Sequence, residues 1–226
     1  MAAATSDTLF SGLPSALSAS LFRQARGEPT GSPTDAFAAG DSGDGCYQVE
    51  EELLKVTSVP PLGGERILAV LGPGELVGEL VDDRWVPRSA SVSGIHESKL
   101  SFVSRAVFNA VAHTQPEIYR HITAFLARRL RDVDDALTAT SFLPLKARTA
   151  RALLSLSDAF GKEIGSGRVL IRQKFSQSDL AAMAGIAREN CSRILQDWTR
   201  RSLVSRLAGY YCLENKPALE PECGTG

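Results

Sequence analysis

The stretch SQSDLAAMAGIARENCSRILQDWTR, residues 176–200, carries the clearest pattern in the chain. Ser176 followed three residues later by Asp179 is typical of a helix start, since each side chain can accept from the other's backbone N–H. Gly185 indicates a turn, and Ala187 opens a second helix. The second helix has one apolar side, formed by Cys191, Ile194, Leu195 and Trp198. The stretch therefore predicts a helix-turn-helix unit.

The other side of the second predicted helix carries side chains suited to reading DNA. Arg188 and Glu189 lie in its first turn, and Arg193 lies little more than one turn further on, so all three can reach one major groove. Arg can bond guanine O6 and N7 together, and Glu can accept from cytosine N4. Three more polar residues are candidates for phosphate contacts, which position a protein without specifying sequence: Gln177, Ser178 and Ser192. An ordinary helical hairpin with a solvated charged face would show the same motif.

Charge is divided unevenly along the chain. Residues 1–140 hold 12 Lys and Arg against 18 Asp and Glu, a net charge of −6, whereas residues 141–216 hold 13 against 6, a net charge of +7. Such a division favours a domain that meets a polyanion, joined to one that does not. A chance division with a solvated basic face is the alternative. The basic part contains the helix-turn-helix pattern, which favours DNA binding.

The N-terminal half shows β-type signals. Between residues 46 and 102, short apolar runs alternate with Gly- and Pro-rich turns, which predicts a small sandwich or barrel. The predicted strands lie near residues 47–49, 53–59, 67–71, 89–93 and 100–103. Ahead of them, apolar spacing predicts a short helix over residues 9–26, and composition predicts loops over residues 27–45.

A long helix is predicted over residues 117–140, after a short one over residues 104–115. Its apolar and small positions are spaced 4-3-4-3-4-3, the 3.5-residue period of a two-stranded coiled coil. These positions are Tyr119, Thr123, Leu126, Leu130, Val133, Leu137 and Thr140. A helix packed on its own domain is the alternative, but three heptads flanked by charge favour a dimer helix. Pro144 ends it. Another amphipathic helix, a Gly-rich turn and a short strand follow over residues 146–160, 165–167 and 168–171.

Several other classes of protein are disfavoured. No apolar run approaches the roughly 20 residues that span a bilayer, and residues 1–8 lack the features of a signal peptide, so a cytoplasmic location is expected. Cys46, Cys191, Cys212 and Cys223 form neither C-x-x-C pairs nor clusters with the three histidines, so no metal site or disulfide is expected. An enzyme on a cupin-like barrel would usually need a His-rich metal site. The chain is therefore expected not to be an enzyme.

Six stretches in order and spacing resemble the Crp/Fnr superfamily of transcription regulators, over about residues 37–213. They are GDSGDGCY (40–47), LLKV (53–56), ILAVLGPGELVGEL (67–80), PRSASV (87–92), ARRL (127–130) and QSDLAAMAGIARENCSRIL (177–195). The resemblance implies an α+β fold: an N-terminal double-stranded β-helix (a cupin-like, cyclic-nucleotide-binding β-roll), a long dimerisation helix and a C-terminal winged helix-turn-helix. The corresponding domains are residues 1–115, 116–143 and 144–226.

The resemblance also implies function. It implies a homodimer that binds a palindromic duplex site and acts with RNA polymerase, not at a membrane. Arg188, Glu189 and Arg193 carry over as base readers, with a half-site of TGTGA type. Ala187 departs from the Ser or Thr that relatives often carry, which removes a helix cap.

A cyclic nucleotide such as cyclic AMP is the implied effector, held by a G-E-L…R-S-A cassette. In this chain the cassette is Gly78, Glu79, Leu80, Arg88, Ser89 and Ala90, with Arg129 as the orienting partner of Glu79. Arg88 would pair with the phosphate. Three departures stand against a simple transfer: Asp82-Asp83 near the phosphate, Val133-Asp134 in place of an adenine-reading Thr-Ser pair, and Glu52 at a turn glycine position.

Two alternatives to effector control therefore stay open from the sequence. One is a regulator with a degenerate pocket that acts without an effector, and the other is an effector-sensing protein that acts through protein partners without DNA.

Overall fold

The computed structural model of the chain describes residues 20–22, 26–28, 35–43, 45–59, 64–78 and 87–224. These residues fall into two compact units, one drawn from Asp7–Pro61 and Leu68–Asp132 and the other from Leu62–Ile67 and Val133–Gly226. The first is mainly β, and the second is mainly helical with a small sheet. The α+β fold expected from the sequence is confirmed.

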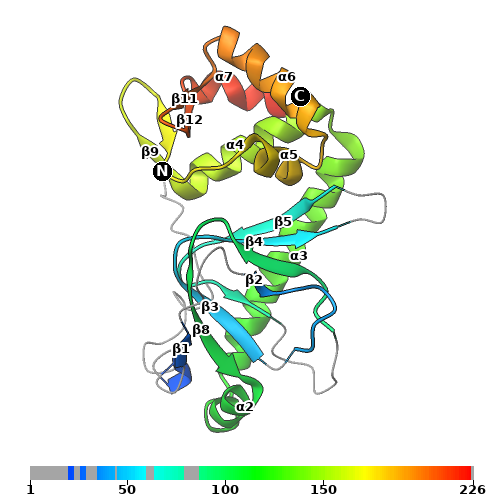
Figure 1. Cartoon of the computed structure of the whole chain (residues 1–226), viewed down its shortest axis with the longest axis vertical. Coiled ribbons are helices and arrows are strands. Elements are labelled where there is room, and N and C mark those ends of the chain that lie inside the picture. Colours follow the sequence, from blue (N-terminus) through cyan, green and yellow to red (C-terminus); the bar gives the residue numbers. More distant parts are fainter. Residues whose placement is uncertain are drawn as a thin grey trace. The chain divides into compact units, whose positions relative to one another are not determined.

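The first unit contains two four-stranded sheets, with strand orders β1-β8-β3-β6 and β2-β7-β4-β5. Their strands are β1 (Arg26–Glu28), β2 (Asp35–Phe37), β3 (Gly45–Glu51), β4 (Leu54–Ser58), β5 (Arg66–Leu71), β6 (Leu76–Val77), β7 (Ser91–Gly94) and β8 (Lys99–Ser104). Figure 1 shows β3 and β8 side by side, and they pair antiparallel from Gly45↔Ser104 to Glu51↔Lys99. The pairs β1–β8, β2–β7, β3–β6, β3–β8 and β4–β7 are antiparallel.

Inward-facing residues of both sheets form one apolar core. Val49, Val77 and Leu100 come from the first sheet, and Leu54 and Val92 come from the second. Successive side chains of a strand point to opposite faces, so each sheet buries one face against the other. This produces the β-roll that cradles the candidate effector site.

Two helices follow the sheets. α2 (Arg105–Thr114) begins where β8 ends, and Ser104 caps it by accepting a hydrogen bond from the backbone N–H of Val107 at 3.3 Å. The first turns of α3 (Ile118–Phe142) then pack Ile118 and Ile122 beside Phe108 of α2. Leu21 joins this cluster from the helical residues 20–22. Further along α3, Leu126, Leu130, Val133, Leu137 and Phe142 are exposed.

The second unit is built on α4 (Leu145–Phe160), which begins directly after Pro144. A four-stranded antiparallel sheet of order β11-β12-β10-β9 packs with four further helical elements of the described residues. Its elements are β9 (Gly161–Glu163), β10 (Val169–Ile171), α5 (Gln177–Ala184), α6 (Arg188–Arg200), β11 (Val204–Leu207), β12 (Tyr210–Leu213), α7 (Lys216–Leu219) and the 3₁₀ helix η1 (Glu220–Cys223). Leu153, Phe175 and Trp198 are completely buried in its core.

Some local expectations were wrong. Arg26 begins strand β1, so the helix predicted over residues 9–26 does not extend that far, and most of that segment lies outside the described residues. Residues 35–37, expected as loop, form β2 because they pair with β7. Turn-like composition was overridden there by pairing with a neighbouring strand.

Candidate DNA interface and effector pocket

Two local features fix the ends of α5, the first helix of the helix-turn-helix. Ser176 Oγ accepts from the N–H of Asp179 at 3.0 Å, and the Asp179 carboxylate accepts from the N–H of Ser176 at 2.8 Å, which completes the predicted capping box. At the other end of α5, Gly185 is left-handed, with φ 61° and ψ 46°. Glycine adopts that conformation without the steric cost of a Cβ. The chain can therefore reverse sharply into α6.

The orientation of α6 follows from its buried side. Cys191, Leu195 and Trp198 are at most 5% exposed, so this side faces the core. Arg188, Glu189 and Arg193 lie on the other side and are all exposed. The structure therefore brings the three predicted base readers together at the start of one solvent-facing helix surface.

The predicted phosphate contacts lie on α5 and α6, the two helices of the helix-turn-helix. Gln177 and Ser178 occupy the first turn of α5, where Gln177 is half-buried and Ser178 is exposed. Ser192 lies between Glu189 and Arg193 on α6 and is half-buried. Ala187 precedes α6 without a side-chain cap, as its residue type predicted.

Arg148 of α4 supports the turn in a way the sequence did not reveal. Its Nε donates to the carbonyl of Ala184 at 2.9 Å, and its Nη2 donates to the carbonyl of Gly185. The last carbonyls of a helix lack intrahelical partners, so one arginine satisfies two of them. An arginine on an amphipathic helix gives no sequence signal of this role, because the contact joins residues 36 and 37 positions apart.

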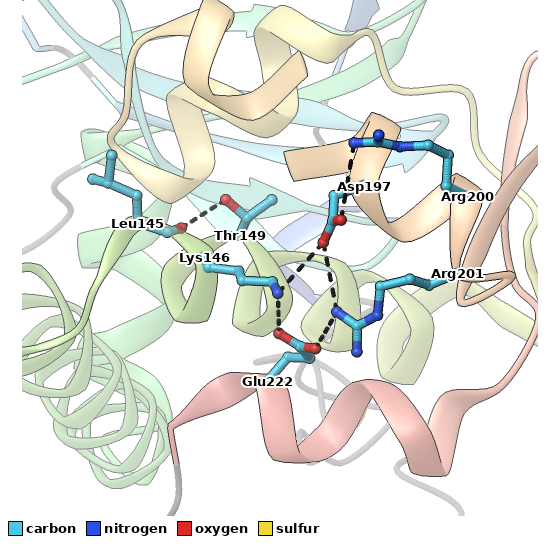
Figure 2. A network of polar contacts seen from close by, with 7 residues as sticks. All are labelled: Leu145, Lys146, Thr149, Asp197, Arg200, Arg201 and Glu222. Carbon is cyan, nitrogen blue, oxygen red and sulfur yellow. Dashed lines mark hydrogen bonds and ion pairs between the residues drawn. The ribbon is translucent and has the colours of Figure 1, made fainter. Parts of the chain in front are cut away.

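An ion-pair network holds the far end of α6. Figure 2 shows Asp197 and Arg201 meeting Lys146 of α4 and Glu222 of η1. Glu222 lies 2.9 Å from Lys146 Nζ and 2.6 Å from Arg201 Nη1, and Asp197 lies 3.5 Å from both cations. Burial alone would raise the pKa of Glu222, but hydrogen bonds from Lys146 and Arg201 outweigh it and lower that pKa. Lys146 and Arg148 of α4 thus hold the far end of α6 and the turn that precedes it.

The small sheet is held by a second ion pair. Arg168 donates from Nε to Glu214 at 2.5 Å and from Nη2 at 3.1 Å, and Ser205 donates to the same carboxylate. The hydrogen bonds from Arg168 and then Ser205 lower the pKa of Glu214 to about 2. Glu214 directly follows β12. Its carboxylate therefore connects Ser205 of β11 with Arg168, the residue before β10.

In the first unit, Arg88 lies in a cradle of glycines. It is 4% exposed, its Nη2 donates to the carbonyl of Gly45 at 2.8 Å, and its guanidinium lies 4.3 Å from the ring centre of Phe37. A Cβ at Gly78 would come 2.7 Å from Arg88 Nη1, and one at Gly43 would come 3.3 Å from Arg88 Cζ. Side chains larger than hydrogen would therefore fill the space around this guanidinium.

Arg88 has unused hydrogen-bonding capacity. Within the described ranges, its Nε and Nη1 are buried without a hydrogen-bond partner. A buried cation is costly unless an anion or acceptors compensate it, so these residues fit an anionic group such as a phosphate. Cys46 lies close by, and burial raises the pKa of its thiol to about 12 despite the lowering effect of Arg88. That thiol is therefore neutral near pH 7.

The remaining cassette residues divide into three cases. Ser89 is exposed, and Ala90 is half-buried against the sheet core. Glu79 and Leu80 lie outside the described residues. Arg129 of α3 is half-buried and acts electrostatically on Glu75, whose pKa is raised by burial.

Glu52, between β3 and β4, adopts a φ of 65°. This is the positive value expected at a turn glycine position.

Metal and disulfide chemistry find no support in the described part of the chain. It contains no group of three or more His, Cys, Asp or Glu residues that could hold a metal ion. All four cysteines are free thiols. Among the helices that the structure describes, none is long and apolar enough to cross a membrane.

Comparisons with known proteins agree with this geometry. A cyclic nucleotide-binding domain model matches residues 36–115, and a Crp-like helix-turn-helix domain model matches residues 147–222. The CRP-like cAMP-activated global transcriptional regulator of Mycobacterium tuberculosis is 31% identical over 173 residues, 76% of each chain. The Cyclic AMP receptor protein of Thermus thermophilus is 35% identical over 183 residues, 80% of this chain and 79% of that one.

The chain belongs to the Crp/Fnr family of transcription regulators. It is a Crp-like DNA-binding regulator with a cyclic nucleotide-binding domain, and the family is not enzymatic. Among solved structures, the c-di-GMP responsive global regulator CLP of Xanthomonas campestris shares the fold, with a TM-score of 0.74 at 23% identity over 88% of this chain and 99% of that chain.

Proposed function

We propose that this Crp/Fnr regulator binds a palindromic duplex as a homodimer, reads each half-site with Arg188, Glu189 and Arg193, and responds to a cyclic nucleotide at Arg88. The observation that carries the proposal is the face of α6, where these three exposed side chains lie opposite a fully buried side. Such a face can enter a major groove without disturbing the core.

Base recognition follows from the chemistry of the three readers. Arg188 and Arg193 each present a fork of donors that matches guanine, and Glu189 offers acceptors to cytosine. The half-site proposed on this basis is of TGTGA type. Gln177, Ser178 and Ser192 are assigned to phosphates, which fix the register of α6 without adding sequence information.

The dimer is supported by the exposed seam of α3. Leu126, Leu130, Val133 and Leu137 are 53–64% exposed in the single chain, although they form a heptad pattern. Burying one such side chain contributes about 1.5–3 kcal/mol, so a second copy of the helix is the natural cover. The proposed division is a sensor over residues 1–115, a dimer helix over 116–143 and a DNA-binding domain over 144–226. RNA polymerase is the proposed protein partner, in the cytoplasm.

For the effector, the unpaired Nε and Nη1 of Arg88 support a ligand with a phosphate. The two relatives described above are named for cyclic AMP, which makes it the first ligand to test. Val133 and Asp134 stand at the positions assigned to adenine contacts by resemblance, so the proposal specifies the cyclic phosphate rather than the base.

DNA selection from a random duplex library, with the full chain and moderate salt, tests the DNA-binding proposal. We expect a two-fold palindrome, and an affinity that falls steeply with salt because phosphate neutralisation releases counterions. Enrichment of no sequence would overturn it. Sedimentation of the free protein tests the dimer, and a monomer at working concentration would contradict it.

Calorimetry tests the effector separately, with cyclic AMP, cyclic GMP and cyclic di-GMP as probes. We expect at least one to bind and to change the affinity for the selected duplex. Selection of the same site with no response to any probe would instead indicate an effector-independent regulator. Binding of a probe with no selected DNA would favour an effector-sensing protein that acts through protein partners.

A further inference from the structure

A cleft of about 530 Å³ lies between the start of α5, the second half of α6 and the hairpin β11–β12. Its polar lining comprises Gln177, Gln196, Thr199, Arg200, Ser205, Arg206 and Tyr211, and its apolar lining comprises Leu195 and Val204. None of the described residues that line it is acidic. The polar part of the lining therefore offers amides, hydroxyls and two guanidinium groups, which suit an anion, beside an apolar wall of Leu195 and Val204.

The cleft continues the reading face of α6. Gln196 is seven residues after Glu189, and Arg200 is seven residues after Arg193. Seven residues make about two turns of an α-helix and about 10 Å of rise. Gln196 and Arg200 thus lie on the same side of α6 as Glu189 and Arg193, two turns further along.

Tyr211 supplies a second and independent observation. It is 1% exposed, it lines the cleft, and its hydroxyl is buried without a hydrogen-bond partner among the described residues. Buried hydroxyl groups normally have a partner, so this one indicates a group that joins it in the functional complex. Burial raises the pKa of Tyr211 to about 12, and the hydroxyl therefore stays protonated and can donate near pH 7.

The two arginines are available to the same ligand. Arg200 has 79% of its side chain exposed, and its nearest ion-pair contact is a long one of 4.0 Å to Asp197. Arg206 is exposed, donates to the carbonyl of Phe175, and lies 4.4 Å from the ring centre of Tyr211. The other two hydroxyls of the lining already donate, that of Ser205 to the Glu214 carboxylate and that of Thr199 to the carbonyl of Leu195.

We propose that this cleft seats a backbone phosphate of the bound duplex, held by Arg200, Arg206 and the hydroxyl of Tyr211. The proposal rests on the proposed DNA-binding function and extends its footprint beyond the base readers. Phosphates line both rims of a major groove about 12 Å wide, and a helix whose first turns lie in the groove brings its later turns toward a rim. Arg206 moves from the Tyr211 ring toward the phosphate, which its exposed side chain allows.

The sharpest variant is Tyr211→Phe, which removes only the unpartnered hydroxyl. We expect the variant to fold with unchanged or higher thermal stability and to bind the selected duplex several-fold more weakly. Unchanged DNA affinity would overturn the role of the hydroxyl. Since the aromatic ring is kept, this outcome does not depend on a damaged fold.

Three variants test the two cations. They are Arg200→Ala, Arg206→Lys and the double variant Arg200→Ala/Arg206→Ala. We expect the double variant to reduce the slope of log K against log salt by about one per protomer, because one phosphate contact is lost, and Arg200→Ala to reduce it by no more than that. Arg206→Lys should keep the slope. The weakening should be equal on matched and mismatched sites. Arg151→Ala, an exposed charge on α4, is the matched control and should leave the slope unchanged. An equal slope for wild type and the double variant would overturn the proposal.

Single methylphosphonates placed along the duplex locate the phosphate. We expect one position per half-site to weaken wild-type binding but not binding by the double variant. Titration with inorganic phosphate provides the other arm: tight binding of the free anion that Tyr211→Phe abolishes would assign the cleft to a free anion instead. If wild type selects no DNA sequence, the proposed function itself fails. Specific binding that ignores the cleft variants refutes only this inference.

Discussion

Arg88 in the β-roll and Arg188 on α6 place the same guanidinium group in opposite surroundings. Arg88 is 4% exposed, and two of its nitrogens lack hydrogen-bond partners among the described residues. Arg188, a proposed base reader, is exposed, so water can satisfy its donors until the proposed base contact replaces that water. A solvated reading surface can therefore be complete before its partner arrives, whereas a buried cation is complete only with an anion.

The largest expected effect concerns Arg88, the buried arginine of the two. Replacing Arg88 by Met should weaken binding of a cyclic nucleotide by about 2–5 kcal/mol, because it removes a buried charge partner of the phosphate. The ligand-free protein should lose no stability, because an apolar side chain replaces an incompletely compensated charge. Calorimetry with cyclic AMP and thermal unfolding without ligand measure the two effects.

Arg120→Met is the matched control for the Arg88 variant, because Arg120 is an exposed arginine of the same unit. It should change neither the nucleotide affinity nor the unfolding temperature appreciably. A variant at Arg88 that unfolds well below wild type but keeps its nucleotide affinity would show that the guanidinium is a structural group, not a ligand contact.

Substitution of Arg188, the exposed arginine, should affect DNA binding instead. Arg188→Ala should cost about 1–3 kcal/mol on the selected duplex and relax discrimination at one base pair, since a bidentate contact is lost. Stability should be unchanged, because the side chain is solvated. Binding titrations on duplexes substituted at each half-site position measure the effect. An equal loss on every sequence would reassign Arg188 to the phosphate backbone.

Patterns that depend on nearest neighbours were predictable from the sequence. The Ser176–Asp179 capping box and the left-handed Gly185 lie within a few residues of the groups they satisfy, and both are confirmed. Both follow from backbone rules that residue type alone expresses. The positive φ of Glu52 is different, because the resemblance to the family implied it and the residue type did not.

Contacts between distant segments were not predictable in the same way. Arg148 bonds the turn of the helix-turn-helix. Glu222 of η1 joins Lys146 of α4 to Arg201 at the end of α6. The sequence matched Arg88 to a family cassette, but its burial and unused donors appear only when the sheets bring Gly43, Gly45 and Gly78 around it. These features depend on tertiary packing, which no local period encodes.

A smaller effect is expected from the helix caps of the helix-turn-helix. The start of α5 has a side-chain cap, and the start of α6 does not. Ala187→Ser should add a cap and stabilise the protein by about 1 kcal/mol. Ser176→Ala is the reciprocal change and should destabilise it by a similar amount. Chemical denaturation measures both. If Ala187→Ser left stability unchanged, the start of α6 would already be satisfied by other groups.

The smallest effect concerns acid stability of the reading unit. Arg168 and Ser205 hold the pKa of Glu214 at about 2, below its ordinary 4.5. A carboxylate with a lowered folded pKa contributes stability above its unfolded pKa, and that contribution is lost as pH falls through the folded value. Glu214→Gln should therefore lose at most about 1 kcal/mol at pH 7, because the pair is partly exposed.

The difference between wild type and Glu214→Gln should shrink as pH falls from about 4.5 toward 2. Unfolding by urea at several pH values measures it. Glu163→Gln, an exposed carboxylate of β9 in the same sheet, is the control and should follow wild type throughout. A constant difference at every pH would mean that the glutamine fails through shape or hydrogen bonding, and that the charge of Glu214 adds nothing to the stability of the small sheet.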